Sequence, residues 1–325
     1  MEWPVLVFGR AAAALLVERF TGYPKELFAR ISHPVVWFGK LINILDDQLN
    51  LPGVPAKEGR VRGVAALAIL VAAAFIPAFI VARVLEHLTF GWLAEVLIAT
   101  AFIAQKSMRD HVMAVYDALG RSLPEARKAV SMIVGRDPTQ LDESGVSKAA
   151  LESLAENTSD GIVAPALWYA LLGLPGIVVY KAINTADSMI GHKSDKYLDF
   201  GWAAARIDDL VNLPASRLTG LLFAAARPAQ FSSVVAIMRR DAPKHQSPNA
   251  GWPESAMAAA LGLRFGGPRS YVGEMVELPY MGEGRDAITR DDIRRGLALL
   301  SRAMWLLLFG LLFVAILVAA VDLSP

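Results

Sequence analysis

Acidic and amide side chains are densely grouped in the segment ESLAENTSDGIVAP, residues 152–165. On a helix, Glu152 and Glu156 share a face, with Asn157 and Asp160 at its end. Like charges at this spacing repel, so a cation between them would make the arrangement more favourable. Oxygen ligands suit Mg²⁺, which commonly takes one or two carboxylates and completes its shell with water and phosphate oxygens. The segment predicts a metal site; the alternative is a solvated helix end that caps the next helix.

A second polar group occupies residues 180–209. Lys181, Asn184 and Asp187 recur at helical spacing directly after an apolar stretch. Further charged residues follow a glycine turn: Lys193, Arg206, Asp208 and Asp209. Ammonium, guanidinium and carboxylate groups in this mixture could bind a Mg²⁺–phosphate assembly through positioning and charge neutralisation. The alternative is a pair of helices beside a membrane, held by internal salt bridges.

Several other kinds of site are excluded by the sequence. The five histidines have no HxxxH or HExxH spacing, and there is no cysteine, which argues against zinc, iron–sulfur clusters and disulfides. No GxxxxGK[ST], strand-led GxGxxG or GxSxG motif occurs, so P-loop, Rossmann and serine-hydrolase sites are not expected. A formal net charge of +1 gives no electrostatic reason to bind nucleic acid.

The composition is that of a membrane protein. Hydrophobic residues make up 54% of the 325 residues and charged residues only 19%, against about 25% charged in soluble domains. The uncharged segments 63–82 and 303–321 are long enough to cross a hydrocarbon core of ~30 Å. Spans are expected near residues 4–20, 63–82, 88–104, 161–180 and 303–321. We therefore predict an all-α polytopic integral membrane protein with four to five intramembrane helices.

Between the spans lie three polar blocks, residues 21–62, 105–160 and 181–302, in which helical periodicity predicts amphipathic helices. The stretch 33–50 has apolar residues at helical spacing, and Thr289 with Asp292 resembles a capping box that opens the last helix. The whole chain, 1–325, is expected to form a single membrane domain. The short, nearly uncharged loop after the second span favours the outer side, which puts the first two polar blocks in the cytoplasm. The third block joins them only if residues 161–180 do not cross fully, or if a second passage near residues 210–226 returns the chain. Arg217 makes that second passage costly for lipid exposure.

Five longer strings occur in a fixed order along the chain. HPV begins at His33, ESLAENTSDGIVAP at Glu152, YKAINTADSMIGHK at Tyr180, DFGWAAARIDDLVNLPASRLT at Asp199 and SPNAGWPESAMAAALGLRFGG at Ser247. Together they resemble the CobD/CbiB family of cobalamin biosynthesis, the membrane-bound adenosylcobinamide-phosphate synthases. The resemblance spans most of the chain.

The resemblance implies an amide-forming ligase. Its substrates would be adenosylcobyric acid and (R)-1-amino-2-propanol or its O-phosphate, and its product adenosylcobinamide or its phosphate. A carboxylate is a poor acyl donor, so ATP with Mg²⁺ is expected to convert it to an acyl phosphate that the amine attacks. The catalytic residues implied are Asp208, Asp209, Asp187 and Lys181. Those implied for substrate or phosphate binding are Lys193, Arg206, Asn184, Asn249, Trp252 and Glu254, and those for metal are Glu152, Glu156, Asn157 and Asp160.

The resemblance also implies a setting. It places the protein in the bacterial inner membrane, in contact with lipid. The loop charges favour an active face toward the cytoplasm, and the net charge gives no reason to expect a nucleic-acid partner. Self-association or contact with other late cobalamin-pathway proteins is a further expectation.

Two other functions remain open. A non-catalytic AmpE-like membrane sensor would share the layout of spans but lack the acidic and NAGWP strings. A corrinoid transporter would place ionisable groups near the middle of its spans. Here the ionisable groups lie between the predicted spans, with Glu95 the main exception.

Overall fold

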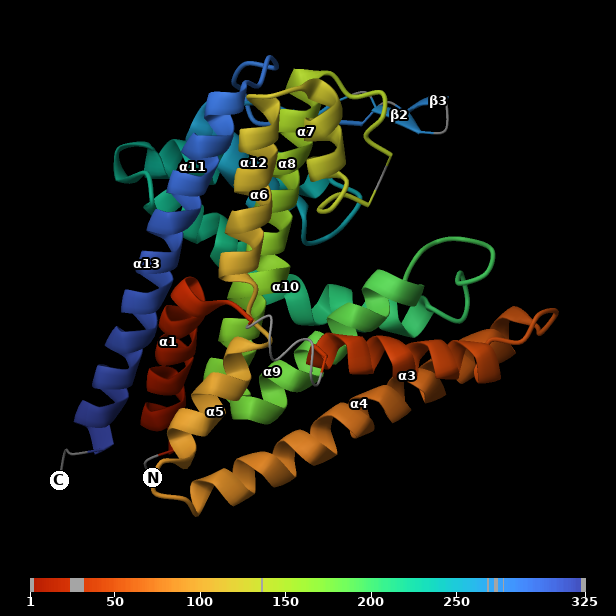
Figure 1. The fold of residues 1–325 in the computed structure, drawn as a ribbon, viewed down its shortest axis with the longest axis vertical. Helices are drawn as coiled ribbons and strands as arrows, with labels where there is room; N and C mark the ends of the chain where they lie inside the picture. Colours follow the sequence, from red (N-terminus) through yellow and green to blue (C-terminus); the bar gives the residue numbers. More distant parts are fainter. Residues whose placement is uncertain are drawn as a thin grey trace. The chain divides into compact units, whose positions relative to one another are not determined.

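The computed structural model describes residues 3–23, 32–135, 137–267, 269–271, 274–276 and 278–322. The described chain is almost entirely helical, as Figure 1 shows. Its α-helices are α1 (Trp3–Thr21), α3 (Pro34–Leu49), α4 (Ala56–Glu86), α5 (Gly91–Thr100), α6 (Gln105–Leu119), α7 (Leu123–Val130), α8 (Glu143–Thr158), α9 (Ala164–Ile190), α10 (Trp202–Ala225), α11 (Phe231–Asp241), α12 (Gly251–Leu261) and α13 (Arg290–Asp322). A π-helical turn, Ser159–Val163, joins α8 to α9, and short 3₁₀ turns, Pro228–Gln230 and Ala242–Lys244, flank α11.

Two small β-ribbons depart from the all-α prediction. β1 (Phe265–Gly266) pairs antiparallel with β4 (Tyr280–Met281), and β2 (Arg269–Tyr271) with β3 (Glu274–Val276). Strands of two or three residues are too short to leave an alternating pattern in the sequence. The chain turns out of α12 through glycines with positive φ, which break helical geometry without steric cost.

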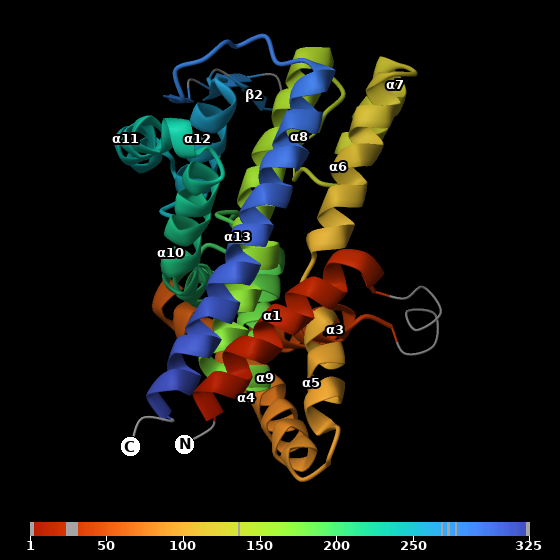
Figure 2. The same cartoon turned by 90° about the vertical axis from the view of Figure 1, so that its left-hand side faces the viewer.

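The chain divides into two compact units. The first contains residues 1–104, 164–212 and 310–325, and the second contains residues 105–163 and 213–309. In the first unit, α9 packs against α1, α3 and α4, and Figure 1 shows α3 beside α4. In the second, α6, α7 and α8 pack together, and α12 packs against α8 and α11; Figure 2 shows α11 beside α12. The single membrane domain over 1–325 stays a prediction.

Local sequence signals explain how two of the helices begin. At the start of α3, His33 is the N-cap: its Nδ1 accepts the Val35 N–H at 3.2 Å, and Pro34 occupies the first helical position. At the start of α13, the Asp292 carboxylate accepts the Thr289 N–H at 2.8 Å and the Thr289 hydroxyl at 3.0 Å. The predicted amphipathic helix and the predicted capping pair are both confirmed.

Three helical runs have the length and apolar composition to cross a membrane. They are Ala56–Glu86, Glu143–Ile190 and Arg290–Val321, and a bent pair, Trp202–Ala225 with Pro228–Lys244, passes the same test as a broken span or re-entrant loop. The predicted spans 63–82, 161–180 and 303–321 lie within the first three. Over the described residues this gives three candidate spanning helices, or four if the bent pair forms one span.

The other two predicted spans do not meet the same test of length and composition. In the region 88–104, α5 has only ten residues, about 15 Å at 1.5 Å per residue, which is half of a ~30 Å hydrocarbon core. In the region 4–20, α1 has 19 residues but carries three charges, Arg10, Glu18 and Arg19, and it is not among the helices apolar enough to span. Apolar composition predicted both helices, but it did not fix their length or their surroundings.

Candidate functional site

The predicted site residues fall into two clusters, one in each unit. The α9–α10 cluster in the first unit comprises Lys181, Asn184, Asp187, Lys193, Arg206, Asp208 and Asp209. The α8–α12 cluster in the second unit comprises Glu152, Glu156, Asn157, Asp160, Asn249, Trp252 and Glu254. Each cluster is described by itself.

A chain of hydrogen bonds runs through the α9–α10 cluster. Lys181 Nζ donates to Asn184 Oδ1 at 3.1 Å, and Asn184 Nδ2 donates to Asp208 Oδ1 at 3.4 Å. The other Asp208 oxygen accepts from Asn212 Nδ2 at 2.9 Å, and Asn212 Oδ1 accepts from the Tyr180 hydroxyl at 2.9 Å. Asp208, Asn212 and Tyr180 are buried. Two amides from two helices therefore hold both oxygens of one buried carboxylate.

The remaining charged residues of this cluster lie close enough to act on one another. Asp187 and Asp209 both repel the Asp208 carboxylate, while Arg206 and Lys193 attract Asp209. Arg206 and Lys193 are exposed, and Asp209 is half-buried. Mutually repelling carboxylates beside accessible cations are suited to a ligand that carries both phosphate and a divalent cation. These residues lie near one another within the first unit, and their assignment to catalysis and phosphate binding stays a prediction.

The end of α9 is shaped to keep Asp187 in place. The Gly191 N–H donates to the Asp187 carbonyl at 2.8 Å, which closes the last turn. A Cβ at Gly191 would come within 2.0 Å of Asp187 Oδ1. Only glycine therefore lets the chain leave the helix directly beside this carboxylate, and the turn then delivers Lys193.

The loop that carries Lys193 is anchored to α3. Asp46 Oδ2 accepts from Lys196 Nζ at 2.7 Å and from the Tyr197 hydroxyl at 3.0 Å, and Asn50 Nδ2 donates to the Lys196 carbonyl at 3.1 Å. Burial opposes the charged form of Asp46, but the hydrogen bonds outweigh it and hold its pKa below the ordinary value. The polar face of α3 thus fixes a loop of the site.

His33 connects the HPV string to the α9–α10 cluster. Burial lowers the pKa of its imidazole, and the positive charge of Lys181 lowers it further, against a backbone hydrogen bond involving Ala101. A depressed pKa keeps the ring neutral at neutral pH, consistent with its Nδ1 accepting the Val35 N–H. The capping role explains the residue locally, and the proximity to Lys181 places it at the edge of the cluster.

In the α8–α12 cluster, the two glutamates have different surroundings. Glu152 is buried, and its Oε1 accepts the Gly266 N–H at 2.9 Å, whereas Glu156 is exposed. Asn157 Nδ2 donates to the Ser153 carbonyl at 2.9 Å. Asp160 lies in the π-helical turn after α8, a distortion often found at functional sites. Spacing on the helix therefore did not give the glutamates one shared environment.

A metal cage made of protein side chains alone is not present among the described residues. No group of three or more His, Asp or Glu side chains converges there in a way that could hold a metal ion. Mg²⁺ bound to a nucleotide needs only one or two protein carboxylates, because phosphates and water complete its shell. The donor types in both clusters fit that mode of binding. The assignment of Glu152, Glu156, Asn157 and Asp160 to metal stays a prediction.

Asn249 and Trp252 meet an arginine that the sequence did not single out as a site residue. The Arg217 guanidinium lies 4.5 Å from the Trp252 ring centroid, and its Nη1 donates to Asn249 Oδ1 at 3.1 Å. The Ser216 hydroxyl also donates to Asn249 Oδ1, at 3.1 Å. The Ser247 hydroxyl accepts the Asn249 N–H, which fixes the turn. Sequence reasoning treated Arg217 only as a cost to lipid exposure, although an arginine in an apolar stretch is itself a sign of function.

Glu254 lies in the first turn of α12 and is buried. His245 Nε2 lies 3.8 Å from Glu254 Oε1, so a charged imidazole would form an ion pair with it. His245 was not among the predicted residues. Together, Glu254, His245, Arg217 and Asn249 line the turn-rich segment with groups that can bind anions and accept protons.

A family profile described as CobD/Cbib protein matches residues 11–300. This range includes both clusters. The chain belongs to the CobD/CbiB family. The expected resemblance is thereby confirmed.

Members of the CobD/CbiB family from several bacteria resemble the chain over nearly their whole length. It is 49% identical over 307 residues to "Cobalamin biosynthesis protein CobD" of Sinorhizobium fredii, covering 91% of this chain and 93% of that protein. It is 51% identical over 297 residues to a protein of the same name from Rhodobacter capsulatus, covering 90% and 92%. The protein of that name from Brucella suis is 50% identical over 287 residues, covering 86% and 88%. No solved structure matches the chain.

Proposed function

We propose that the chain acts in cobalamin biosynthesis by joining adenosylcobyric acid to (R)-1-amino-2-propanol or its O-phosphate. The observation that carries the proposal is the family match over residues 11–300, within which the α9–α10 cluster brings carboxylates and accessible cations together. Three or four apolar helices support a membrane location. The bacterial inner membrane and a cytoplasmic active face belong to the same proposal.

The reaction needs activation of both partners. A carboxylate has no good leaving group, and an aliphatic amine is mostly protonated at neutral pH. When bound, ATP with Mg²⁺ would supply the phosphoryl group that turns the carboxylate into an acyl phosphate. The amine nitrogen then forms the new bond to the acyl carbon, and inorganic phosphate leaves with one former carboxylate oxygen. Holding both reactants in place is worth up to ~7–11 kcal/mol of the barrier in favourable cases.

In this proposal the exposed cations of the α9–α10 cluster bind phosphate. Lys193 and Arg206 flank Asp209, and charge-assisted hydrogen bonds from such groups are stronger than neutral ones. Lys181 is tied to Asn184 and through it to Asp208, so it positions the carboxylate and offers further positive charge. These contacts support a phosphate-binding role more than a purely structural salt-bridge network, because Lys193 and Arg206 are exposed.

The proposed roles of the carboxylates in this cluster differ because the carboxylates are buried to different extents. Asp208 is buried and bound by two amides, which suits a positioning role. Asp209 is half-buried beside exposed cations, so it is the better placed of the two to accept a proton from the incoming ammonium. Asp187 adds negative charge that would favour a divalent cation or an ammonium group.

The α8–α12 cluster is proposed to serve the large substrate. Glu152, Glu156, Asn157 and Asp160 remain the candidates for Mg²⁺, and Asn249 and Trp252 for the corrin ring. Arg217 covers one face of the Trp252 indole, so a flat ring would stack on the other face. Glu254, beside His245, is a further polar group that could contact the substrate.

A direct test uses purified protein in mild detergent. Adenosylcobyric acid is supplied with aminopropanol or with aminopropanol phosphate, and the amide product is followed by mass spectrometry. We expect product only when ATP and Mg²⁺ are both present. Folded protein that makes no amide from either amine would overturn the proposal and favour a sensor or a transporter.

A further inference from the structure

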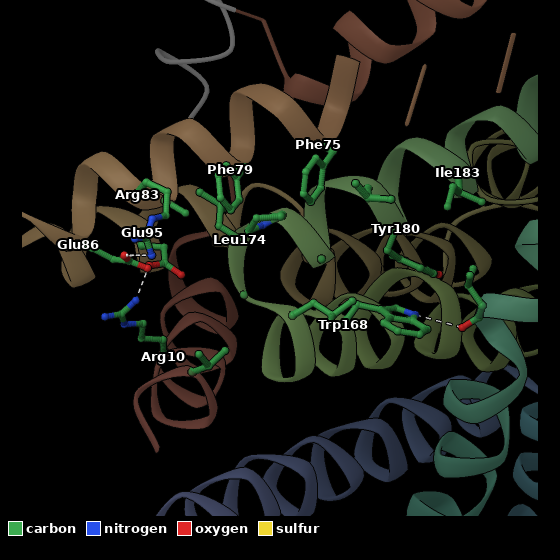
Figure 3. Close-up of a pocket in the computed structure, with 18 residues that line it drawn as sticks. Arg10, Phe75, Phe79, Arg83, Glu86, Glu95, Trp168, Leu174, Tyr180 and Ile183 are labelled. Atoms are coloured by element: carbon green, nitrogen blue, oxygen red, sulfur yellow. Dashed lines mark hydrogen bonds and ion pairs between the residues drawn. The ribbon is translucent and has the colours of Figure 1, made fainter. Parts of the chain in front are cut away.

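An apolar cavity in the first unit takes no part in the proposed chemistry. It has a volume of about 480 Å³ and lies between α4 and α9, with residues of α1 and α5 at one end (Figure 3). Its walls are apolar and aromatic and include Phe75, Phe79, Trp168 and Leu174. Figure 3 shows the charged residues gathered at one end, and Tyr180 and Ile183 toward the other; the charged residues are Arg10, Arg83, Glu86 and Glu95. The volume lies within the ~300–1,000 Å³ typical of small-molecule sites.

A break in α9 accounts for the space. Gly173 has φ 66° and ψ −157°, outside the helical region, and Pro175 follows two residues later. A Cβ at Gly176 would lie 2.4 Å from the Trp168 carbonyl oxygen, so the chain folds back closely there. The small residues around the break leave room opposite Phe75 and Phe79 on α4.

The charged end contains one buried pair and one accessible pair. Arg10 Nη1 lies 2.5 Å from Glu95 Oε2, with side chains 16% and 4% exposed. Arg83 Nη1 lies 2.6 Å from Glu86 Oε2, with side chains 59% and 29% exposed. Arg10 Nε is buried without a hydrogen-bond partner, which leaves a donor for an oxygen acceptor of a ligand. The outer pair offers one cation and one anion to a headgroup.

The cavity is placed at the depth a lipid would require. The uncharged run 63–82 of α4 is about 30 Å long at 1.5 Å per residue, which matches a hydrocarbon core. Arg83 and Glu86 therefore fall where the hydrocarbon ends, and Phe79 and Phe75 lie one and two turns inside it. On the same helix, the outward apolar face includes residues 76 and 80, two isoleucines that are 54% and 55% exposed.

We propose that this cavity binds a zwitterionic glycerophospholipid of the phosphatidylethanolamine type. One acyl chain lies along Phe75, Phe79 and Trp168. The phosphate pairs with Arg83 and the ammonium with Glu86. A lipid of net negative charge would leave Glu86 facing phosphate without a compensating ammonium group, which disfavours it. The proposal does not rest on the proposed amide chemistry, although Tyr180 lines the cavity and also donates to Asn212 of the α9–α10 network.

The test compares lipid retention in a filled and an unfilled cavity. Ala82 lines the cavity, while Ala73 on the same helix is exposed and does not line it, so A82W is the probe and A73W its matched control. Each protein is reconstituted with equal amounts of phosphatidylethanolamine, phosphatidylglycerol and phosphatidylcholine, purified in mild detergent and examined by native mass spectrometry. We expect wild type and A73W to retain phosphatidylethanolamine and A82W to lose it about tenfold, or ~1.4 kcal/mol. Equal retention by A82W would overturn the proposal.

Headgroup variants test the charge argument. R83A should lower the retention of all three lipids, whereas E86Q should mainly remove the preference for phosphatidylethanolamine over phosphatidylglycerol. Wild-type protein that retains phosphatidylglycerol as well as phosphatidylethanolamine would contradict the assigned headgroup.

Photo-cross-linking of the wild-type protein is a second test of the cavity, and it does not depend on whether A82W folds. Phosphatidylethanolamine with a diazirine near the middle of one acyl chain is photolysed in membranes that contain the wild-type protein. The adducts are assigned to single residues, and they are expected on lining residues such as Phe75, Phe79 and Trp168. Labelling confined to the outward residues Ile76 and Ile80, or no adducts in the ranges 75–82 and 168–176, would contradict the cavity.

Discussion

The α9–α10 and α8–α12 clusters hold their acidic residues in different ways. In the α9–α10 cluster, Asp208 is fixed by two amides and lies within electrostatic reach of Asp187 and Asp209. In the α8–α12 cluster, Glu152 is buried against a backbone N–H, while Glu156, one helical turn later, is exposed. The first arrangement concentrates charge at one place, and the second separates it. Shared burial and hydrogen bonding, and not spacing on a helix, decide whether neighbouring acids act together.

The largest effect on activity is expected from replacing Asp209 of the α9–α10 cluster. D209N should lower kcat for amide formation by about 10²–10⁴-fold, the range typical of a lost general base, with a smaller change in KM. Steady-state kinetics of the purified variant measure this. A D209N enzyme with wild-type kcat and an unchanged pH profile would remove Asp209 from proton transfer and leave the cluster a binding site.

A smaller loss of substrate binding is expected when Arg206, one of the two exposed cations of the α9–α10 cluster, is replaced. R206A should raise KM for ATP or for aminopropanol phosphate, because a hydrogen bond to a charged group is worth ~1.5–3 kcal/mol, or roughly 10–150-fold. Arg121 is also exposed but lies outside both clusters, where it pairs with Glu125, so R121A is the matched control. Equal KM values for the two variants would break the assignment of phosphate to this cluster.

The two glutamates of α8 provide a test of burial. E152A should lower the free energy of unfolding by ~1–3 kcal/mol, since it leaves the Gly266 N–H without its acceptor, while E156Q should change it by less than ~0.5 kcal/mol. Chemical unfolding in detergent measures both. E156Q is also the sharper probe of metal: an unchanged rate and Mg²⁺ dependence would exclude Glu156 as a ligand.

The smallest predicted effect is a pH dependence at Asp46. Its pKa is lower in the folded protein than in the unfolded chain, so its contribution to stability is present above the unfolded value and is lost as pH falls through the folded value. The melting temperature of wild type should therefore fall more steeply than that of D46N below about pH 4. Parallel melting curves for the two proteins would show that Asp46 does not stabilise the loop that carries Lys193.

The sequence predicted well what depends on local pattern. The helix after His33, the pair Thr289 and Asp292, and the long apolar spans all follow from spacing and composition. The four-residue separation of Asp208 and Asn212 was also readable, and it could have identified Asn212 as a partner. Local rules therefore accounted for most of the helices and for the α9–α10 cluster.

What the sequence could not give depends on contacts between distant residues. The bond between Tyr180 and Asn212, the stacking of Arg217 on Trp252, and the Gly266 N–H at Glu152 each join segments far apart in the chain. The strands around Gly266 are too short to leave an alternating pattern in the sequence.

One labelling experiment tests the central claim of carboxylate activation most directly. Adenosylcobyric acid with ¹⁸O in the reacting carboxylate is incubated with the purified protein, the amine, ATP and Mg²⁺, and the released phosphate is examined by mass spectrometry. We predict one ¹⁸O atom in inorganic phosphate for each amide formed. Amide formed with unlabelled phosphate, or with the label in AMP, would contradict an acyl phosphate.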